Sequence, residues 1–266
     1  MKLVKPKKAL GQHFLKDLQI AQRIADTLSD YPSTPVLEIG PGMGVLTQFL
    51  LEADHDLTVV ELDMESVAYL QTNFPDLKGR IIPADFLKLD LAKLFPGAFC
   101  VIGNYPYNIS SQIFFKVLEY KDRIPCCSGM LQKEVAERMI AKPGSKAYGA
   151  LSVAVQYYTE PAIVLDVPPR SFIPAPEVDS CVIACRVRET PAVAVREEKL
   201  FFRVVRAAFG QRRKTLANAL KGGGFPKEQV RDAMERAGVD PLRRGETLSL
   251  AEFAALSDAF SDLAAP

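Results

Sequence analysis

Apolar and polar positions alternate along the first 130 residues in a repeated strand and helix order. Short apolar runs bounded by Gly, Pro or Asp predict buried strands, and segments with an apolar residue every three to four positions predict helices. The predicted strands are 35–40, 57–62, 79–85, 99–103 and 126–131, and the predicted helices are 17–29, 46–53, 64–73 and 110–119. This alternation is typical of a doubly wound, mostly parallel α/β sheet.

The pattern changes after residue 158. Two β-rich runs, TEPAIVLDVP and VDSCVIACRVR, flank the proline-rich PPRSFIPAPE, and we expect them to form antiparallel strands at one edge of the sheet. From about Val193 the pattern is helical, with breaks at 222–224 and 238–241. We therefore predict an α/β domain over residues 1–189 and a small all-helical domain over residues 190–266.

Composition narrows the class of protein. The chain has 266 residues, of which 48% are hydrophobic, as expected of a packed globular protein. No stretch approaches the roughly 20 apolar residues of a membrane span, and the N-terminal MKLVKPKKALGQHF is too polar for a signal peptide. We expect a cytoplasmic protein without a membrane partner.

Cysteine and histidine do not indicate a metal centre. The five cysteines form no CxxC pair and mostly lie in apolar runs, where Cys behaves as a small hydrophobic residue. Cys181 and Cys185 are the candidate ligands, but with only two histidines in the chain a zinc site would need residues from unrelated segments. We predict no metal.

The net charge of +1 hides two basic zones. Four lysines lie within the first eight residues, including Lys5, Lys7 and Lys8, and the segment 196–214 holds seven basic residues against two acidic ones. Such zones form either solvated surfaces or contacts with phosphates. In the second zone, we expect the side chains of Arg212, Arg213 and Lys214 to project toward solvent.

The first predicted strand ends in LEIGPGMGVLT, with glycines at 40, 42 and 44. Glycine lets the backbone turn tightly and approach a ligand, although tight turns also use it for structure alone. The next strand ends at Glu61, which is suited to accept hydrogen bonds from ribose hydroxyls. The third ends at Asp85, which is suited to accept one from an adenine amine. Because all three groups follow strand ends, the sequence predicts a nucleoside cofactor site.

The strand at 99–103 leads into Asn104, Tyr105, Pro106 and Tyr107. The Asn104 amide oxygen and the Pro106 carbonyl are suited to accept hydrogen bonds from an exocyclic amine, while Tyr107 stacks on the ring. Such a site positions a weakly nucleophilic amine in line with a sulfonium methyl and needs no strong base. The alternative is a proline turn in which Asn104 caps the next helix, although Ser110 or Ser111 is better placed as that cap.

The chain resembles the bacterial small-subunit rRNA adenine dimethyltransferases. The shared motifs are KKALGQHFLKD, EIGPGMGVLT, ELD, ADFL, NYPYNIS, LQKEVAERM, SKAYGALSV, SFIPAPEVDS and FGQRRKTLANAL, which together cover nearly the whole chain. The resemblance implies a Rossmann-like class I methyltransferase that uses S-adenosylmethionine. It also implies dimethylation of two adjacent adenosines near the 3′ end of 16S rRNA, in the small ribosomal subunit or its precursor. We expect a monomer with a role in subunit biogenesis and an RNA-binding C-terminal domain.

The resemblance also implies roles for individual residues. The expected cofactor contacts are His13, Leu15, Gly40, Gly42, Glu61, Asp85 and Asn104. The expected catalytic residues are Asn104, Pro106, Tyr107 and Phe172, the last as a second aromatic ring against the adenine. This chain departs from the family at Tyr105, where leucine is usual and isoleucine or phenylalanine occur. Because Asn104 and Pro106 set the main-chain geometry, we expect activity to survive the wider ring.

Three other functions stay open. A 23S rRNA methyltransferase of the macrolide-resistance type shares the catalytic half, and a DNA adenine methyltransferase uses similar chemistry. A ribosome assembly factor, whose binding matters more than its chemistry, is the third. The FGQRRKTLANAL segment favours the small-subunit enzyme over the first two.

Overall fold

The computed structural model describes residues 4–7 and 10–264. It divides into two compact units, the larger formed by Met1–Ala136 with Glu160–Val187 and the smaller by Glu137–Thr159 with Arg188–Pro266. The sequence-based division at residues 189 and 190 instead assigns 137–159 to the α/β domain. In the structure the ring of Tyr157 stacks on Phe201, with 4.8 Å between ring centroids, so aromatic packing joins this segment to the C-terminal helices.

The larger unit is built on a mixed seven-stranded sheet in the order β4-β3-β2-β5-β6-β9-β7. Pairing is parallel from β4 to β6, and β9 is antiparallel to β6. The strands are β2 (Val36–Ile39), β3 (Leu57–Glu61), β4 (Ile81–Pro83), β5 (Cys100–Asn104), β6 (Cys126–Gln132), β7 (Thr159–Val167) and β9 (Ser180–Val187). The predicted parallel sheet with an antiparallel edge is confirmed.

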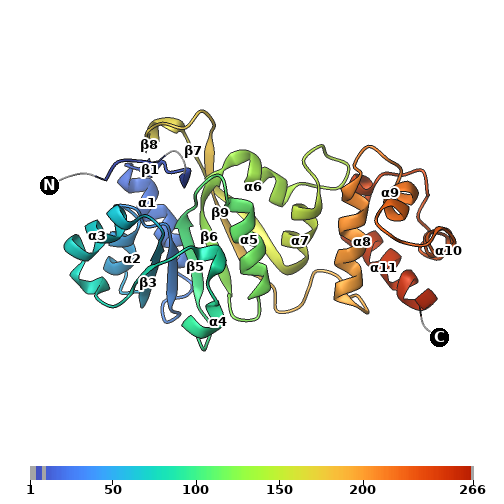
Figure 1. The fold of residues 1–266 in the computed structure, drawn as a ribbon, viewed down its shortest axis with the longest axis horizontal. Coiled ribbons are helices and arrows are strands. Elements are labelled where there is room, and N and C mark those ends of the chain that lie inside the picture. Colours follow the sequence, from blue (N-terminus) through green and yellow to red (C-terminus); the bar gives the residue numbers. More distant parts are fainter. Residues whose placement is uncertain (1–3, 8–9, 265–266) are drawn as a thin grey trace. The chain divides into compact units, whose positions relative to one another are not determined.

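Helices cover both faces of this sheet. In Figure 1, α1 to α3 lie on one side of the central strands, and α4 and α5 lie on the other. Asp17 and Asp63 cap α1 and α3 by accepting hydrogen bonds from main-chain N–H groups. The helices are α1 (Leu18–Ala25), α2 (Thr47–Glu52), α3 (Met64–Asn73), α4 (Leu91–Leu94), α5 (Ser110–Glu119) and α6 (Lys133–Ile140), which crosses the boundary between the units. Short 3-10 turns are η2 (Asp26–Leu28), η3 (Pro75–Leu77), η4 (Phe86–Lys88) and η5 (Pro169–Ser171).

A second, two-stranded sheet joins the N-terminal arm to the proline-rich segment. Strand β1 (Phe14–Leu15) pairs antiparallel with β8 (Phe172–Ile173), so that Leu15 lies opposite Phe172. The sequence pattern does not predict this pairing because each strand has only two residues and the partners are more than 150 positions apart. The pairing brings two of the family motifs, GQHFL and SFIPAP, side by side.

The smaller unit is helical, as predicted for the C-terminal segment. Its helices are α7 (Ala150–Tyr158), α8 (Glu198–Gly210), α9 (Leu216–Gly222), α10 (Lys227–Arg236) and α11 (Leu250–Ala264), with a 3-10 turn η6 (Gly245–Thr247). None of the helices in the described part of the chain combines the length and apolar character that crossing a membrane requires.

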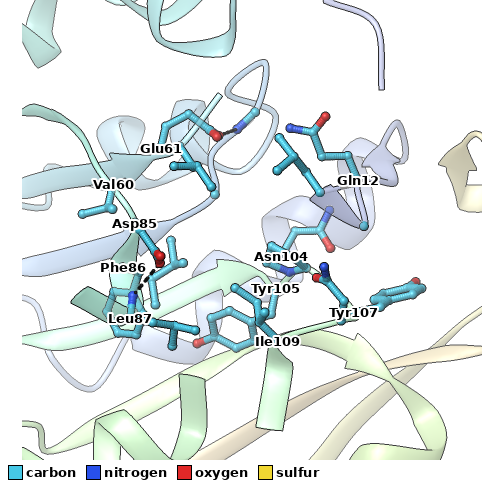
Figure 2. A pocket seen from close by; sticks show the side chains of 18 of the residues that line it. Gln12, Val60, Glu61, Asp85, Phe86, Leu87, Asn104, Tyr105, Tyr107 and Ile109 are labelled. Carbon is cyan, nitrogen blue, oxygen red and sulfur yellow. Dashed lines mark hydrogen bonds between the residues drawn. The ribbon is translucent and has the colours of Figure 1, made fainter. Parts of the chain in front are cut away.

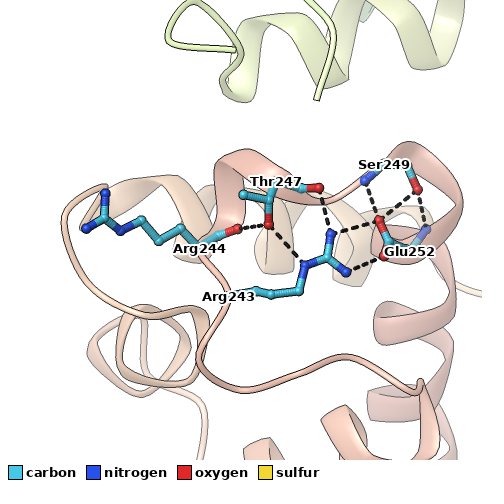
Figure 3. Close-up of polar contacts among 5 residues, drawn as sticks. All are labelled: Arg243, Arg244, Thr247, Ser249 and Glu252. Atoms are coloured by element: carbon cyan, nitrogen blue, oxygen red, sulfur yellow. Dashed lines mark hydrogen bonds and ion pairs between the residues drawn. The ribbon is translucent and has the colours of Figure 1, made fainter. Parts of the chain in front are cut away.

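A polar network fixes the start of α11 (Figure 3). The Glu252 carboxylate accepts hydrogen bonds from the Ser249 N–H at 2.8 Å and from the Arg243 guanidinium. Arg243 also donates to the hydroxyl and carbonyl of Thr247. The hydrogen bonds from Arg243 lower the pKa of Glu252 to about 2, so this carboxylate stays ionised and holds the helix start to the preceding turn.

Candidate active site

The strands β2 to β5 end at one open cavity in the larger unit, with a volume of about 940 Å³ including the space at its mouth. The loops after these strands form its walls together with the N-terminal arm, residues 10–14 (Figure 2). Ligands of open α/β sheets bind at this edge. The cavity brings together eight of the predicted site residues: His13, Gly40, Gly42, Glu61, Asp85, Asn104, Pro106 and Tyr107.

The glycine loop after β2 turns as the sequence predicts. Gly40 and Gly42 have φ angles of +66° and +56°, a region that residues with a Cβ rarely adopt. A Cβ on Gly42 would also lie 2.9 Å from the Phe14 ring of the N-terminal arm. Gly44 also has a positive φ, +79°, and a Cβ there would collide with Phe74 at 2.3 Å. Gly44 is therefore required for packing and does not line the cavity.

Glu61, the last residue of β3, is 5% exposed and holds the glycine loop from the strand next to β2. Its carboxylate oxygens accept hydrogen bonds from the N–H groups of Gly42, at 3.0 Å, and Asp63, at 2.8 Å. Burial raises the pKa of Glu61, and these two hydrogen bonds oppose that rise. Each carboxylate oxygen retains capacity for a further donor, so the group can still bind the hydroxyls of a ribose.

Asp85 begins the loop after β4 and accepts a hydrogen bond from the Leu87 N–H at 3.0 Å. The sequence reading missed the residue that supports this loop, Lys116 on α5. The Lys116 ammonium donates to the carbonyls of Leu87, at 2.9 Å, and Leu89, at 2.5 Å, and lies 5.4 Å from the centre of the Phe86 ring. Burial lowers the pKa of Lys116. A charged residue with carbonyl partners therefore fixes the wall that contains Asp85.

Asn104 forms a contact that the capping alternative does not predict. Its Nδ2 donates to the main-chain carbonyl of His13 at 2.9 Å, which leaves Oδ1 available as an acceptor. Helix α5 begins after Ile109 without a side-chain cap. Ser110 is not the cap either, because its hydroxyl donates to the Tyr107 carbonyl at 3.3 Å. The expectation of a serine cap was therefore wrong, and Asn104 is held by the N-terminal arm.

Tyr107 is fixed at both ends of its side chain. Its ring stacks on the His13 imidazole, with centroids 5.0 Å apart and planes inclined by 23°. Its hydroxyl lies 2.5 Å from the Ser180 Oγ on β9. The His13 Nδ1 is in turn 2.9 Å from the Pro174 carbonyl. Tyr107 therefore presents a ring of defined orientation at the cavity wall.

Leu15 and Phe172 do not line the cavity. They lie opposite each other in the β1–β8 ladder, and their exposed fractions are 4% and 2%. Both belong to the hydrophobic core of the larger unit. For Phe172 to stack on a base, its side chain would have to leave this core. The roles implied for these two residues stay predictions.

The N-terminal arm contributes cavity residues that the sequence reading did not single out. Gln12 accepts a hydrogen bond from the Lys7 N–H at 2.8 Å through its Oε1. Gly11 lies against Asn108, whose Oδ1 would be 2.9 Å from a Cβ at position 11. The only sequence signal for these residues is their place within or beside the GQHFL and NYPYNIS motifs. No group of three His, Cys, Asp or Glu side chains within the described ranges is arranged to hold a metal ion.

The two basic zones are partly occupied by internal contacts. Lys7 pairs with Asp63 and lies 3.5 Å from Glu65, while Lys8 lies outside the described residues. Arg212 donates to Glu246, at 2.9 Å, and to the Tyr148 carbonyl, at 2.9 Å. Arg212 is exposed, as expected, but these bonds also hold its side chain in place. Arg213 and Lys214 are exposed.

The family model for ribosomal RNA adenine dimethylases matches residues 4–262. A ribosomal RNA small subunit methyltransferase A from Parabacteroides distasonis is 70% identical over 221 residues, which is 83% of each chain. The protein of the same name from Bacteroides thetaiotaomicron is 53% identical over 262 residues, covering 97% of this chain and 95% of the relative.

Solved structures are similar over both units. A dimethyladenosine transferase from Plasmodium falciparum has a TM-score of 0.78 and 26% identity, covering 92% of this chain and 96% of its own. The 23S rRNA methyltransferase ErmE has a TM-score of 0.71 and 28% identity, covering 93% and 99%. The family match spans nearly the whole chain, and the NYPY segment lies at the cavity where the glycine loop, Glu61 and Asp85 meet. This chain belongs to the ribosomal RNA adenine dimethylase family.

Proposed function

We propose that this protein transfers methyl groups from S-adenosylmethionine to the N6 amines of adenosines in 16S rRNA, forming dimethyladenosine. The observation that supports this most directly is that Asn104, Pro106 and Tyr107 adjoin Gly40 and Glu61 in one cavity. The finer proposal is that the targets are two adjacent adenosines near the 3′ end of 16S rRNA.

The residues of the cavity fit this cofactor. Of the loop after β2, Gly40 and Gly42 line the cavity, and the buried Glu61 carboxylate is fixed beside it by two N–H donors. We assign Glu61 to the ribose hydroxyls and Asp85 to the adenine amine, with His13 and Asn104 nearer the methionine part. When bound, S-adenosylmethionine supplies an electrophilic methyl group.

The protein's own groups act on the target amine. Because Asn104 Nδ2 is bound to the His13 carbonyl, its Oδ1 can accept a hydrogen bond from the amine. The Pro106 carbonyl already accepts one from the Ile109 N–H at 3.2 Å and keeps a second lone pair for the same amine. In the first transfer, two acceptors favour a more tetrahedral nitrogen and orient its lone pair, while Tyr107 holds the plane of the base. The monomethylated amine keeps one N–H, so one of the two acceptors serves the second transfer.

We further propose that the protein acts as a monomer in the cytoplasm, on the small ribosomal subunit or its precursor. The names of the similar bacterial proteins support the small subunit as the target. The 23S rRNA enzyme ErmE has a comparable fold, so the large subunit is the principal alternative substrate.

Methyl transfer to isolated 30S subunits, 50S subunits and duplex DNA tests this function. We expect transfer to 30S subunits that lack the modification, and dimethyladenosine at the 3′ end of their RNA. Transfer to 50S subunits or to DNA instead would reject the proposal. The Asn104→Ala variant is the matched control, because it should lose turnover by a large factor while it retains binding to 30S subunits.

A further inference from the structure

Tyr105 lies between the two residues assigned to the target amine, but its side chain points elsewhere. Figure 2 shows the rings of Tyr105 and Tyr107 leaving the same segment in different directions. Tyr107 stacks with His13, whereas Tyr105 is 1% exposed and packs under the segment, against the sheet. Tyr105 adjoins the cavity, but because its ring is almost fully buried, the width of the ring also affects the packing that supports the site.

The ring lies against two glycines, although a Cβ on either would also meet a backbone carbonyl, that of Ile39 for Gly103 and that of Gly103 for Gly129. Gly103 on β5 and Gly129 on β6 lie directly opposite each other in the parallel ladder. A Cβ on Gly129 would be 2.6 Å from Cε2 of Tyr105, and a Cβ on Gly103 would be 3.1 Å from its Cε1. The ring therefore lies on a patch of bare backbone at the centre of the sheet.

The far end of the Tyr105 side chain is bonded to β6. Its hydroxyl donates to the Ser128 carbonyl at 2.6 Å and lies 3.3 Å from the Cys127 Sγ. The Tyr105 main-chain N–H donates to the Met130 carbonyl at 2.9 Å. The Phe114 ring of α5 contacts Tyr105 edge-on, with centroids 5.6 Å apart. A leucine at this position has no hydroxyl to form the bond to Ser128.

We propose that Tyr105 is a positioning residue, which fixes the main chain of residues 104–106 to β6 through its ring and hydroxyl. The separation between the Asn104 Oδ1 and the Pro106 carbonyl depends on that main chain, and small displacements of reacting groups reduce rates strongly. This inference rests on the proposed function, because it assigns Tyr105 an effect on the same amine site.

The test compares two variants. Tyr105→Phe keeps the ring against the two glycines and loses the hydroxyl, and Tyr105→Leu loses both the ring and the hydroxyl that bonds to β6. We expect kcat on 30S subunits to fall about three- to tenfold for Tyr105→Phe and further for Tyr105→Leu, because the Asn104 and Pro106 acceptors would be displaced from the target amine. The KM for 30S subunits and the affinity for S-adenosylmethionine should stay within about twofold, because neither set of contacts includes the phenol. The matched control is Tyr31→Phe, whose hydroxyl neighbours Cys126, the first residue of β6 and therefore at the end of that strand far from the cavity. It should keep the wild-type kcat.

The activity of the wild-type enzyme distinguishes failure of the proposed function from failure of the positioning role of Tyr105. If wild-type protein does not methylate 30S subunits, the proposed function fails. If it does, and Tyr105→Phe and Tyr105→Leu are both as fast as wild type at saturating substrates, the positioning role is rejected. A fall in thermal stability with unchanged kcat would also reject it, since Tyr105 would then serve folding alone. Should Tyr105→Leu not fold, the kcat of Tyr105→Phe relative to Tyr31→Phe decides the question.

Discussion

Two carboxyl groups on neighbouring strands show how local contacts decide what a residue does. Glu61 on β3 accepts hydrogen bonds from two main-chain N–H groups and lines the cavity. Glu38 on β2 is 1% exposed and accepts one hydrogen bond, from the Thr47 hydroxyl at 2.7 Å. Burial, only partly offset by that bond, raises the pKa of Glu38 to about 8. Glu61 is therefore suited to a ligand, whereas Glu38 is a buried acid that stays protonated at neutral pH.

Glu61→Ala should weaken the binding of S-adenosylmethionine about tenfold or more, since a hydrogen bond to a charged group contributes roughly 1.5 to 3 kcal/mol. The change also frees the Gly42 N–H and so loosens the glycine loop. Isothermal titration calorimetry measures the affinity directly. Glu65→Ala, which removes an exposed carboxylate on α3, is the control and should bind normally. Wild-type affinity in a folded Glu61→Ala protein would remove Glu61 from the site.

Glu38→Gln should change how stability depends on pH. The unfolded chain ionises Glu38 near its ordinary pKa of 4.5, whereas the folded protein keeps the proton until about pH 8. The stability that depends on this proton is therefore complete below about pH 4.5 and is lost as the pH rises to 8. Glutamine does not titrate, so from pH 5 to 7 the variant should gain about 2 to 3 kcal/mol relative to wild type.

Urea unfolding at pH 5, 6 and 7 measures this gain. Glu65→Gln, at an exposed site, is the control and should follow the wild-type pH dependence. If the Glu38→Gln and wild-type curves run parallel over this range, Glu38 is not a protonated acid in the folded protein.

At the scale of elements, α5 connects two walls of the cavity. It begins directly after the segment that contains Asn104 and Tyr107, and two turns later its Lys116 binds the carbonyls of the loop that follows Asp85. A displacement of α5 would therefore move the amine site and the adenine wall together. The contact between Lys116 and this loop is strong because a charged donor binds two carbonyl acceptors where little water is present.

Lys116→Met keeps most of the apolar stem of the side chain and removes its charge. The carbonyls of Leu87 and Leu89 then lose a donor, so we expect S-adenosylmethionine to bind roughly five- to tenfold more weakly. Lys93→Met, on the exposed face of α4, is the charge-matched control. Equal affinities of the two variants, measured by calorimetry, would show that the loop keeps its shape without Lys116.

The elements that local sequence specifies were predicted, and the contacts between distant segments were not. Strands β2 to β6 and the turn at Gly40 follow from apolar runs and glycine spacing, which act over a few residues. The β1–β8 pairing and the burial of Phe172 depend on residues more than 150 positions apart. Lys116 is similar: its position on a predicted helix was clear, but its carbonyl partners belong to another loop. Sequence patterns identify which residues carry chemistry more readily than which residues hold them in place.

At the scale of the whole molecule, a net charge of +1 is too small to draw the protein to RNA without local basic surfaces. The structure reduces the number of basic side chains in the segment 196–214 that are free to bind RNA phosphates. Arg196 pairs with Asp262, and Arg203 donates to the Gly224 carbonyl and packs on Phe225. Arg212 is bound to Glu246 and to the Tyr148 carbonyl. A triple replacement of Arg212, Arg213 and Lys214 would therefore also break the internal bonds of Arg212. Its effect on RNA binding could then not be assigned to lost phosphate contacts alone.

The sharper test of RNA binding replaces only Arg213 and Lys214, which lie exposed in the turn after α8. If both bind phosphates, the double alanine variant should bind 30S subunits more weakly, and its logarithmic salt slope should fall by roughly 0.7 to 0.9 for each phosphate that is no longer neutralised. The control replaces Lys227 and Arg236, exposed on α10, and removes the same charge.

Binding to 30S subunits is measured across a salt series, with S-adenosylmethionine affinity as the check on folding. Specific phosphate binding predicts a reduced slope for the first pair alone, because a general effect of net charge would alter both pairs equally. Equal slopes would mean that this turn is a solvated surface and would direct the search to the N-terminal lysines, of which Lys5 is exposed and Lys7 is paired with Asp63.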